Sequence, residues 1–194
     1  MNISTTYTKI ITGEDLMETA QHGSTLYPFQ FYYEDLSVFD FNCIEWHWHT
    51  ELEFIYIESG TVTLWIGEDQ FHLTEGNGVF INTKVLHRLY SPSKALIPNF
   101  VFMPSFIAPC DSLIYQKYIL PIISSSLPFL VFHKKVCWQA KVLSIMRQII
   151  SAQDSVLSKE LLTSSLLQNL WLEIFENTDI SYQEEHKDHS TASQ

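Results

Sequence analysis

Apolar and polar residues alternate with a period of two in several short runs near the start of the chain. The runs are PFQFYY (residues 28–33), LEFIYIE (52–58), TVTLWI (61–66), QFHL (70–73) and VFIN (79–82). Gly, Asn, Asp and Ser residues that favour turns separate these runs, and a further short run lies near Phe132. This pattern is typical of an antiparallel β-sandwich or barrel.

From about residue 136 the apolar spacing changes to three and four, which is typical of α-helices. The first predicted helix carries Val136, Ala140, Leu143, Met146 and Ile150 on one face. The second carries one stripe of Leu162, Leu166, Leu170 and Ile174, and a neighbouring stripe of Leu167, Trp171 and Phe175. The sequence therefore predicts a mainly β fold followed by two helices.

The second predicted helix has an apolar arc wider than a single packing contact requires. We expect one part of the arc to contact the barrel of its own subunit. The other part then forms a homodimer interface with a second copy, through Leu162, Leu166, Leu170 and Ile174. The alternative is that both stripes are buried inside one subunit, and the sequence alone does not choose between the two.

The charge balance restricts the partners of this chain. Among 194 residues there are 22 acidic and 11 basic side chains, which gives a formal net charge of −11. Such a chain repels nucleic-acid phosphates and anionic membranes. Three widely spaced cysteines, Cys43, Cys110 and Cys137, suit a reducing compartment. With no secretion signal and no apolar run long enough to span a bilayer, we expect a cytoplasmic protein.

Candidate chemistry gathers in the segment EWHWHTELEF, residues 45–54. If residues 43–49 form a strand, then Cys43, Glu45, His47 and His49 share one face, and the two tryptophans between them share the other. The two histidine Cα atoms would then lie about 7 Å apart, close enough for both imidazoles to reach one metal ion. Glu53 follows across a short turn, and His87 is suited to supply a fourth ligand from another hairpin.

The pattern H-x-H-x-x-x-E at His47, His49 and Glu53, closing at Gly60, resembles the first motif of the cupin superfamily. A second motif would begin at Gly76 and supply His87. The resemblance implies a double-stranded β-helix barrel, or jelly roll, with four metal-ligand positions. The second motif departs from the cupin pattern, since Thr83 and Lys84 stand where Pro and Gly are usual.

Residues 45–92 also resemble the ligand-sensing domain of AraC-type transcription regulators. The resemblance implies a cupin-like effector-binding barrel over residues 1–134, a two-helix dimerisation segment over 135–177, and a polar linker over 178–194. It implies a small-molecule effector such as a sugar. DNA would be bound only through a C-terminal helix-turn-helix domain that is missing here.

Three interpretations of His47, His49, Glu53 and His87 remain open. They could hold a divalent metal for catalysis, form the polar floor of an effector pocket, or be a hydrogen-bonded part of the core. As the sensing domain of a regulator the chain would be no enzyme and would require no cofactor, although a divalent metal could bind. The alternative is a small metal-dependent cupin enzyme, a dioxygenase or an isomerase. Aromatic candidates for the effector pocket are Phe29, Phe31, Tyr33 and Trp65, unless they only pack in the core.

Overall fold

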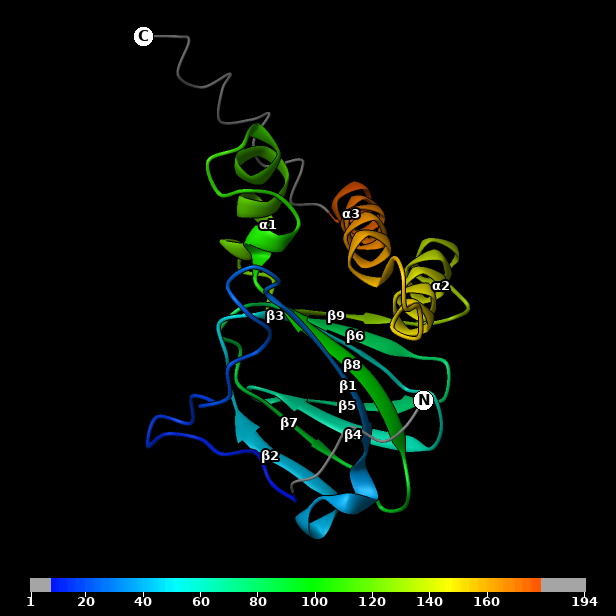
Figure 1. The fold of residues 1–194 in the computed structure, drawn as a ribbon. Helices are drawn as coiled ribbons and strands as arrows, with labels where there is room; N and C mark the ends of the chain where they lie inside the picture. The colour runs from blue at the N-terminus through cyan, green and yellow to red at the C-terminus, as the bar shows by residue number, and fades with distance from the viewer. Residues whose placement is uncertain (1–7, 179–194) are drawn as a thin grey trace, which may run out of the picture.

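Two antiparallel β-sheets face each other in the computed structural model, which describes residues 8–178 (Figure 1). One sheet has the strand order β1-β8-β3-β6-β9 and the other has the order β2-β7-β4-β5. The strands are β1 (Phe29–Asp35), β2 (Cys43–His47), β3 (Leu52–Tyr56), β4 (Thr61–Ile66), β5 (Asp69–Thr74), β6 (Gly78–Ile81), β7 (His87–Tyr90), β8 (Leu96–Phe102) and β9 (Phe129–Phe132). The predicted mainly β architecture is confirmed.

Two long helices, α2 (Cys137–Ala152) and α3 (Lys159–Asn177), follow the last strand and cover the outer face of the five-stranded sheet (Figure 1). The helix α2 begins close to residue 136, where the apolar spacing changes. Among the described helices, none has the length and apolarity needed to cross a membrane. The predicted linker over 178–194 lies, apart from Thr178, outside the described residues.

The chain also contains short helical segments. They are η1 (Leu36–Val38), η2 (Asp40–Asn42), η3 (Pro104–Phe106), the π-helix η4 (Tyr115–Ile119) and α1 (Leu120–Ile123). Sequence analysis missed the helical turns of η4 and α1. Pro121 lies in the first turn of α1, where proline is tolerated, but in the sequence it resembles an interruption of an apolar run.

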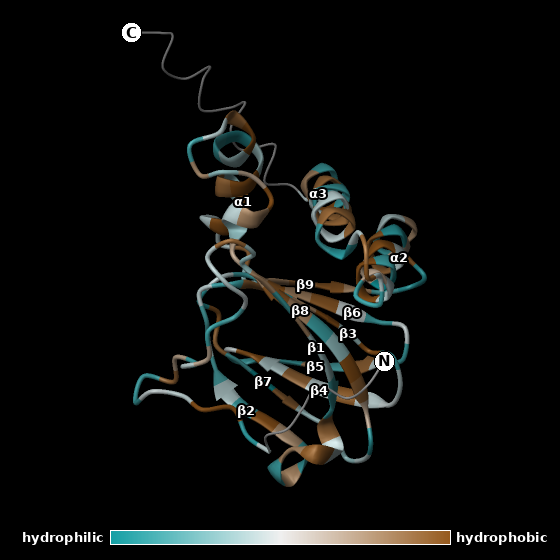
Figure 2. Cartoon of the chain, in the orientation of Figure 1, coloured by the Kyte–Doolittle hydropathy of each residue, from teal (hydrophilic) through white to brown (hydrophobic). Residues whose placement is uncertain are grey.

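Two hydrophobic cores lie on the two faces of the five-stranded sheet. One fills the barrel and includes Ile55 of β3, while the other lies under the helices and includes Phe54 of the same strand. Because both faces of this sheet are covered, every residue of β6 is buried. Figure 2 shows hydrophobic residues along the strands of both sheets, and both hydrophobic and hydrophilic positions on α2 and α3.

The stripe predicted to form the dimer interface belongs mostly to the core of one subunit. Leu166, Leu170 and Ile174 are 8%, 0% and 0% exposed and pack in the core under the helices, whereas Leu162 is 40% exposed. The assignment of the first three to a dimer interface is therefore corrected. Homodimer formation itself stays a prediction.

The neighbouring stripe is buried as well, through the helical segment that the sequence did not reveal. The indole N–H of Trp171 donates to the carbonyl of Tyr118 at 2.8 Å, and Phe175 packs edge-on against the Tyr118 ring. Phe80 of β6 contacts the face of α3 that carries Trp171. Apart from Leu162, the wide apolar arc is thus covered mainly by α2, the sheet and the segment of η4 and α1 within one subunit.

Candidate functional site

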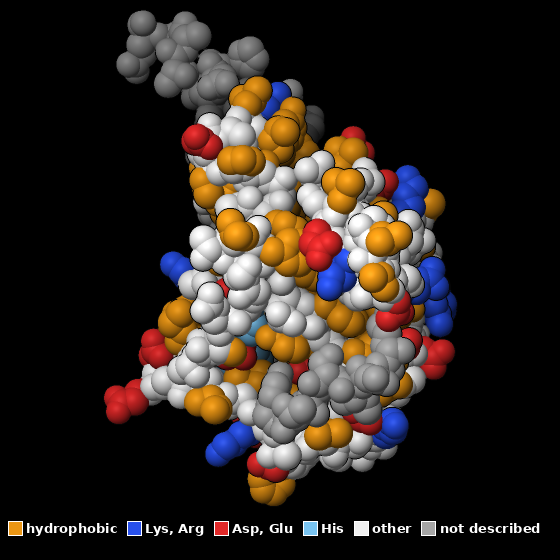
Figure 3. All heavy atoms as spheres, in the orientation of Figure 1, with side chains coloured by type: hydrophobic (Ala, Val, Ile, Leu, Met, Phe, Trp, Pro, Cys, Tyr) orange, Lys and Arg blue, Asp and Glu red, His pale blue; other side chains and the backbone are white. Residues whose placement is uncertain are grey.

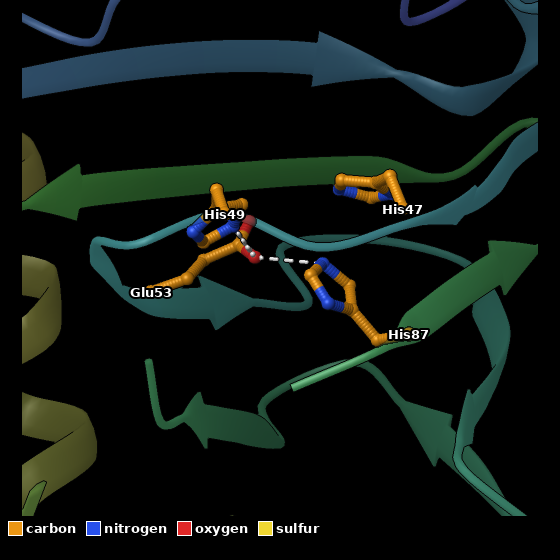
Figure 4. A group of neighbouring side chains, drawn as sticks. All are labelled: His47, His49, Glu53 and His87. Atoms are coloured by element: carbon orange, nitrogen blue, oxygen red, sulfur yellow. Dashed lines mark hydrogen bonds and ion pairs between the residues drawn. The ribbon is translucent and has the colours of Figure 1, made fainter. Parts of the chain in front are cut away.

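Four polar side chains from three parts of the barrel converge inside it (Figure 4). His47 ends β2, His49 follows in the next turn, Glu53 lies in β3 and His87 begins β7. One ligand atom of each lies within 4.8 Å of those of the others. The side chains are only 3%, 4%, 7% and 0% exposed, in the same order. Figure 3 shows histidine atoms on this face only as a small patch enclosed by other side chains. The predicted convergence is confirmed.

The strand that carries the histidines is not a regular one. Its pairing with β7 shifts register between Ile44 and His47, as at a β-bulge. As a result Ile44, His47 and His49 line the barrel cavity, whereas Glu45 is exposed and pairs with Arg88 at 3.0 Å. The expectation that Glu45 shares the face of the histidines was wrong, because a bulge breaks the simple alternation of side chains.

Each histidine of the cluster has its ring fixed by a backbone carbonyl. Nδ1 lies 2.8 Å from the Glu45 carbonyl in His47, 3.1 Å from that of Glu51 in His49, and 2.9 Å from that of Val85 in His87. A carbonyl oxygen can only accept, so Nδ1 carries the proton and donates in all three. This leaves Nε2 as the ring atom free to face the centre, which is the arrangement of a metal-binding imidazole.

The carboxylate of Glu53 lies among these nitrogen atoms. Its Oε2 is 3.3 Å from Nε2 of His49 and 3.1 Å from Nε2 of His87 (Figure 4). In a neutral imidazole with the proton on Nδ1, Nε2 is an acceptor, so the two atoms face each other with lone pairs. Nε2 of His87 accordingly has no hydrogen-bond partner among the described residues. A proton or a cation shared between these atoms would remove the conflict.

The electrostatics of the cluster agree with a shared positive charge. Burial alone would raise the pKa of Glu53, but contacts with His49 and His87 hold the pKa well below its ordinary value. Burial would lower the pKa of His49, and Glu53 reverses that direction and raises it. The pKa of His47 is lowered well below its ordinary value by burial and by His87. Three imidazoles and one carboxylate suit Zn²⁺, Mn²⁺, Fe²⁺ or Ni²⁺, so the residues present fit a divalent metal.

A backbone contact fixes the turn before His87. Lys84 adopts a left-handed conformation with φ of 61°, and its N–H donates to the carbonyl of His49 at 2.8 Å. The side chain of Asn82 donates to the carbonyls of Ile122 and Leu127 at 3.1 and 2.9 Å. The departure from Gly at position 84 therefore leaves the turn in place, with the strain that a left-handed non-glycine residue carries.

The N-terminal segment closes the barrel beside the cluster. Backbone hydrogen bonds join Glu18 and Leu16 to Trp48, the residue between the two histidines, at 2.9 and 3.1 Å. Behind this connection is a cavity of about 30 Å³. It is lined by Ile10, Glu18, His22, Tyr32, Glu34, Ile44, His47, His49, Glu53, Ile55, Leu89, Ile97, Asn99 and Val101.

Sequence analysis missed several polar residues of this cavity. His22 lies 2.9 Å from the Tyr32 hydroxyl through Nδ1 and 3.3 Å from Glu18 through Nε2, and its ring stands 5.7 Å from that of His49. Glu34 accepts from the amide of Asn99 at 2.8 Å. Glu34 stands beside Asp35 at the end of a strand that also contains Gln30, so the sequence offered no distinct signal for it. The sequence offered none for Glu18 and His22.

The four aromatic candidates lie outside the cavity, which corrects the prediction for them. Phe29 stacks on Phe100 in the core under the helices, and Phe31 packs against the same core. Tyr33 donates to Glu58, and Trp65 lies 5.0 Å from the guanidinium of Arg88, on the outer face of the other sheet. Both faces of β1 carry apolar neighbours, so alternation alone could not tell which face points inward.

Comparisons with known proteins agree with this architecture. Residues 43–97 match the family profile described as Cupin domain. Over 143 residues the chain is 24% identical to the uncharacterized HTH-type transcriptional regulator YdeC of Bacillus subtilis (strain 168), covering 72% of this chain and 48% of YdeC. The chain thus spans about half the length of this relative.

Two solved structures show the extent of the structural likeness. ToxT from Vibrio cholerae has a TM-score of 0.54 and 14% sequence identity to this chain. The match covers 80% of this chain and 57% of the ToxT chain. An RmlC-like cupin from Shewanella frigidimarina NCIMB 400 has a TM-score of 0.36 and 17% sequence identity to this chain. The match covers 39% of this chain and 67% of that cupin. The fold is that of a cupin barrel with C-terminal helices.

Proposed function

We propose that this chain is the effector-sensing part of an AraC-type transcription regulator. The effector binds in the barrel cavity beside His47, His49, Glu53 and His87. Its binding changes how DNA is held by a helix-turn-helix region of the complete protein. The proposal is supported by the similarity to YdeC, which is named as an HTH-type regulator, and by the motif block in residues 45–92. A negative charge of −11 fits a part of the protein that does not itself touch DNA.

The observation that carries the proposal is a buried polar cluster that no side chain among residues 8–178 fully neutralises. Each buried polar group without a partner destabilises the fold by about 1–3 kcal/mol, so such a cluster is more stable when a ligand binds to it. In this cluster the Nε2 atoms face the carboxylate of Glu53, at 3.1 Å in His87. The geometry favours a bound ligand over a filled core.

A divalent metal is the first ligand that this cluster would hold. His47, His49 and His87 would bind through Nε2 and Glu53 through a carboxylate oxygen. When bound, the metal would supply a Lewis acid on which an oxygen-bearing effector could coordinate. The protein's own part is to orient the three rings through their Nδ1–H bonds and to exclude water by burial.

A measurement of ligand-dependent stability tests the sensing proposal. The purified protein, freed of metal by a chelator, would be heated with Mn²⁺, Ni²⁺, Zn²⁺ and a set of sugars and small metabolites. A ligand present at about 100 times its Kd should stabilise the fold by about 2.7 kcal/mol. A complete lack of stabilisation by any metal or metabolite would count against the cavity as a sensing site.

A second candidate, a metal-dependent cupin enzyme, is favoured by the same three imidazoles and one carboxylate. The two functions differ in what the complete protein does. A regulator binds a DNA fragment from its own promoter region with an affinity that changes when the effector is added, since two binding sites are then coupled. An enzyme converts its substrate when the metal is bound and shows no coupling between effector binding and DNA binding.

A further inference from the structure

Acidic side chains are prominent in the lining of the cavity beside the cluster of His47, His49, Glu53 and His87. Three carboxylates, those of Glu18, Glu34 and Glu53, line it. Among the described residues that line it there is neither lysine nor arginine. Glu34 and Glu53 are buried, and Glu18 is mostly shielded. Negative groups are therefore concentrated in a space from which bulk water is largely excluded.

Most hydrogen-bond donors of the lining are already used inside the protein, although Nε2 of His22, 3.3 Å from Glu18, has no hydrogen-bond partner among the described residues. The amide group of Asn99 donates to Glu34 at 2.8 Å and to the carbonyl of Ile97 at 3.2 Å. The Tyr32 hydroxyl is engaged with Nδ1 of His22 at 2.9 Å. His47 and His49 direct their Nδ1–H groups away from the centre, to backbone carbonyls. What faces the cavity is mostly acceptor atoms, namely carboxylate oxygens and Nε2 of His47, while the raised pKa of His49 favours a proton between its Nε2 and Glu53.

These groups also affect the pKa of Tyr32. Burial raises the pKa of its hydroxyl first, and the charges of Glu18, Glu34 and Glu53 raise the pKa further. An anion on this side chain is thus opposed by the surrounding carboxylates. The same opposition applies to a carboxylate or phosphate group on a ligand, because a further negative charge here would be both desolvated and repelled.

We propose that the effector of this cavity carries positive charge and hydrogen-bond donors, as a small organic ammonium compound does, with Glu34 and Glu18 as its counter-ions. This inference rests on the proposed function, because it names the ligand class of the same cavity. A volume of about 30 Å³ has room for about two water molecules. A ligand of more than a few atoms therefore has to widen the cavity at the side bordered by Glu18 and His22 of the N-terminal segment.

Three probes of similar size and different charge test the inference. They are ethanolamine as the cation, ethylene glycol as the neutral diol and glycolate as the anion. Each would be titrated at equal ionic strength into chelator-treated protein, so that the amine has no metal to bind. Ligand-observed NMR and thermal unfolding would report binding. We expect ethanolamine to bind at least about tenfold more tightly than ethylene glycol, as a charge-assisted hydrogen bond implies, and glycolate not to bind.

Variants locate the effect in the cavity. Glu34→Gln keeps the side-chain size and can still accept from Asn99, so it should remove the preference for ethanolamine. Glu18→Gln, on the N-terminal segment, tests the same point if the first variant does not fold. Glu68→Gln removes the same charge from an exposed turn and should leave the preference unchanged.

The possible results separate this inference from the proposed function. Binding of glycolate as tight as that of ethanolamine, or a preference that survives in both cavity variants, overturns the inference and leaves the cavity as a sensing site. Stabilisation by metals with no binding of ethanolamine overturns it in the same way. If neither metals nor any probe or metabolite binds, both proposals are overturned.

Discussion

Replacement of Glu53 by glutamine is the most direct test of the cluster as a metal site. The change keeps the shape of a side chain that is only 7% exposed and removes its charge. Without metal we expect the free energy of unfolding to change by no more than about 1 kcal/mol, because no charge is left unpaired. His49 can release its proton, and the new amide can donate to Nε2 of His49 and His87, which lie 3.3 and 3.1 Å from the present oxygen.

With metal the two proteins should differ. At a metal concentration of about 100 times the wild-type Kd, the wild type gains about 2.7 kcal/mol. Loss of one of four ligands that weakens binding about 100-fold brings the variant to its own Kd, where the gain is only about 0.4 kcal/mol. The expected difference is therefore about 2.3 kcal/mol.

Urea unfolding of both proteins, with chelator and with added Zn²⁺ or Mn²⁺, measures these quantities. Glu68→Gln serves as the control, because it removes an acidic charge outside the barrel. If metal stabilises wild type and Glu53→Gln equally, the ion binds elsewhere and the geometric argument fails. If the variant loses several kcal/mol without metal, the carboxylate has a structural role that the tautomer argument overlooked.

Three further predictions concern the framework around the site. Leu170→Ala should lower the free energy of unfolding in urea by about 2–5 kcal/mol, because Leu170 is fully buried. Leu161→Ala, at a position 77% exposed, should lower it by less than about 0.5 kcal/mol. Equal effects would contradict the assignment of Leu170 to the subunit core. Asn82→Asp should lower the free energy of unfolding by about 3 kcal/mol or more, because a carboxylate cannot donate to the two carbonyls that Asn82 now binds. An unchanged melting temperature would refute this. Lys84→Gly should be tolerated, because position 84 has a φ of 61°. In thermal unfolding, Lys84→Val should be about 1–2 kcal/mol less stable than Lys84→Gly. A valine variant as stable as the glycine variant would show that the turn adapts.

Local sequence spacing was sufficient to find the barrel and the centre of the site. Alternating runs and turns predicted β1, β3, β4, β5, β6 and β9, because side chains on a strand alternate whatever the rest of the chain does. They did not predict β7, nor β8, which contains Pro98. The change to helical spacing near residue 136 predicted α2 and α3. His47, His49 and Glu53 are separated by two and four residues, a range over which a strand and one turn leave little freedom. His87 was identified from its resemblance to the second motif.

The remaining features depend on contacts between distant parts of the chain. The bulge before His47 arises from pairing with β7 and turned Glu45 out of the barrel. The helices cover the face of β1 that carries Phe29 and Phe31, so the more apolar face of this strand points away from the cavity. The wide arc of α3 was explained by Tyr118, which lies 53 residues before Trp171 in the chain.

Sequence by itself determined most of the strands and the two long helices, and it placed three of the four ligand-type side chains within one short segment. Only the tertiary structure decided which face of each strand points inward, that α3 is buried within its subunit, and that Glu18 and His22 close the cavity. The physical reason is that periodicity is a property of local backbone geometry. Burial and charge depend instead on which surfaces meet, and those surfaces are brought together only by the complete fold.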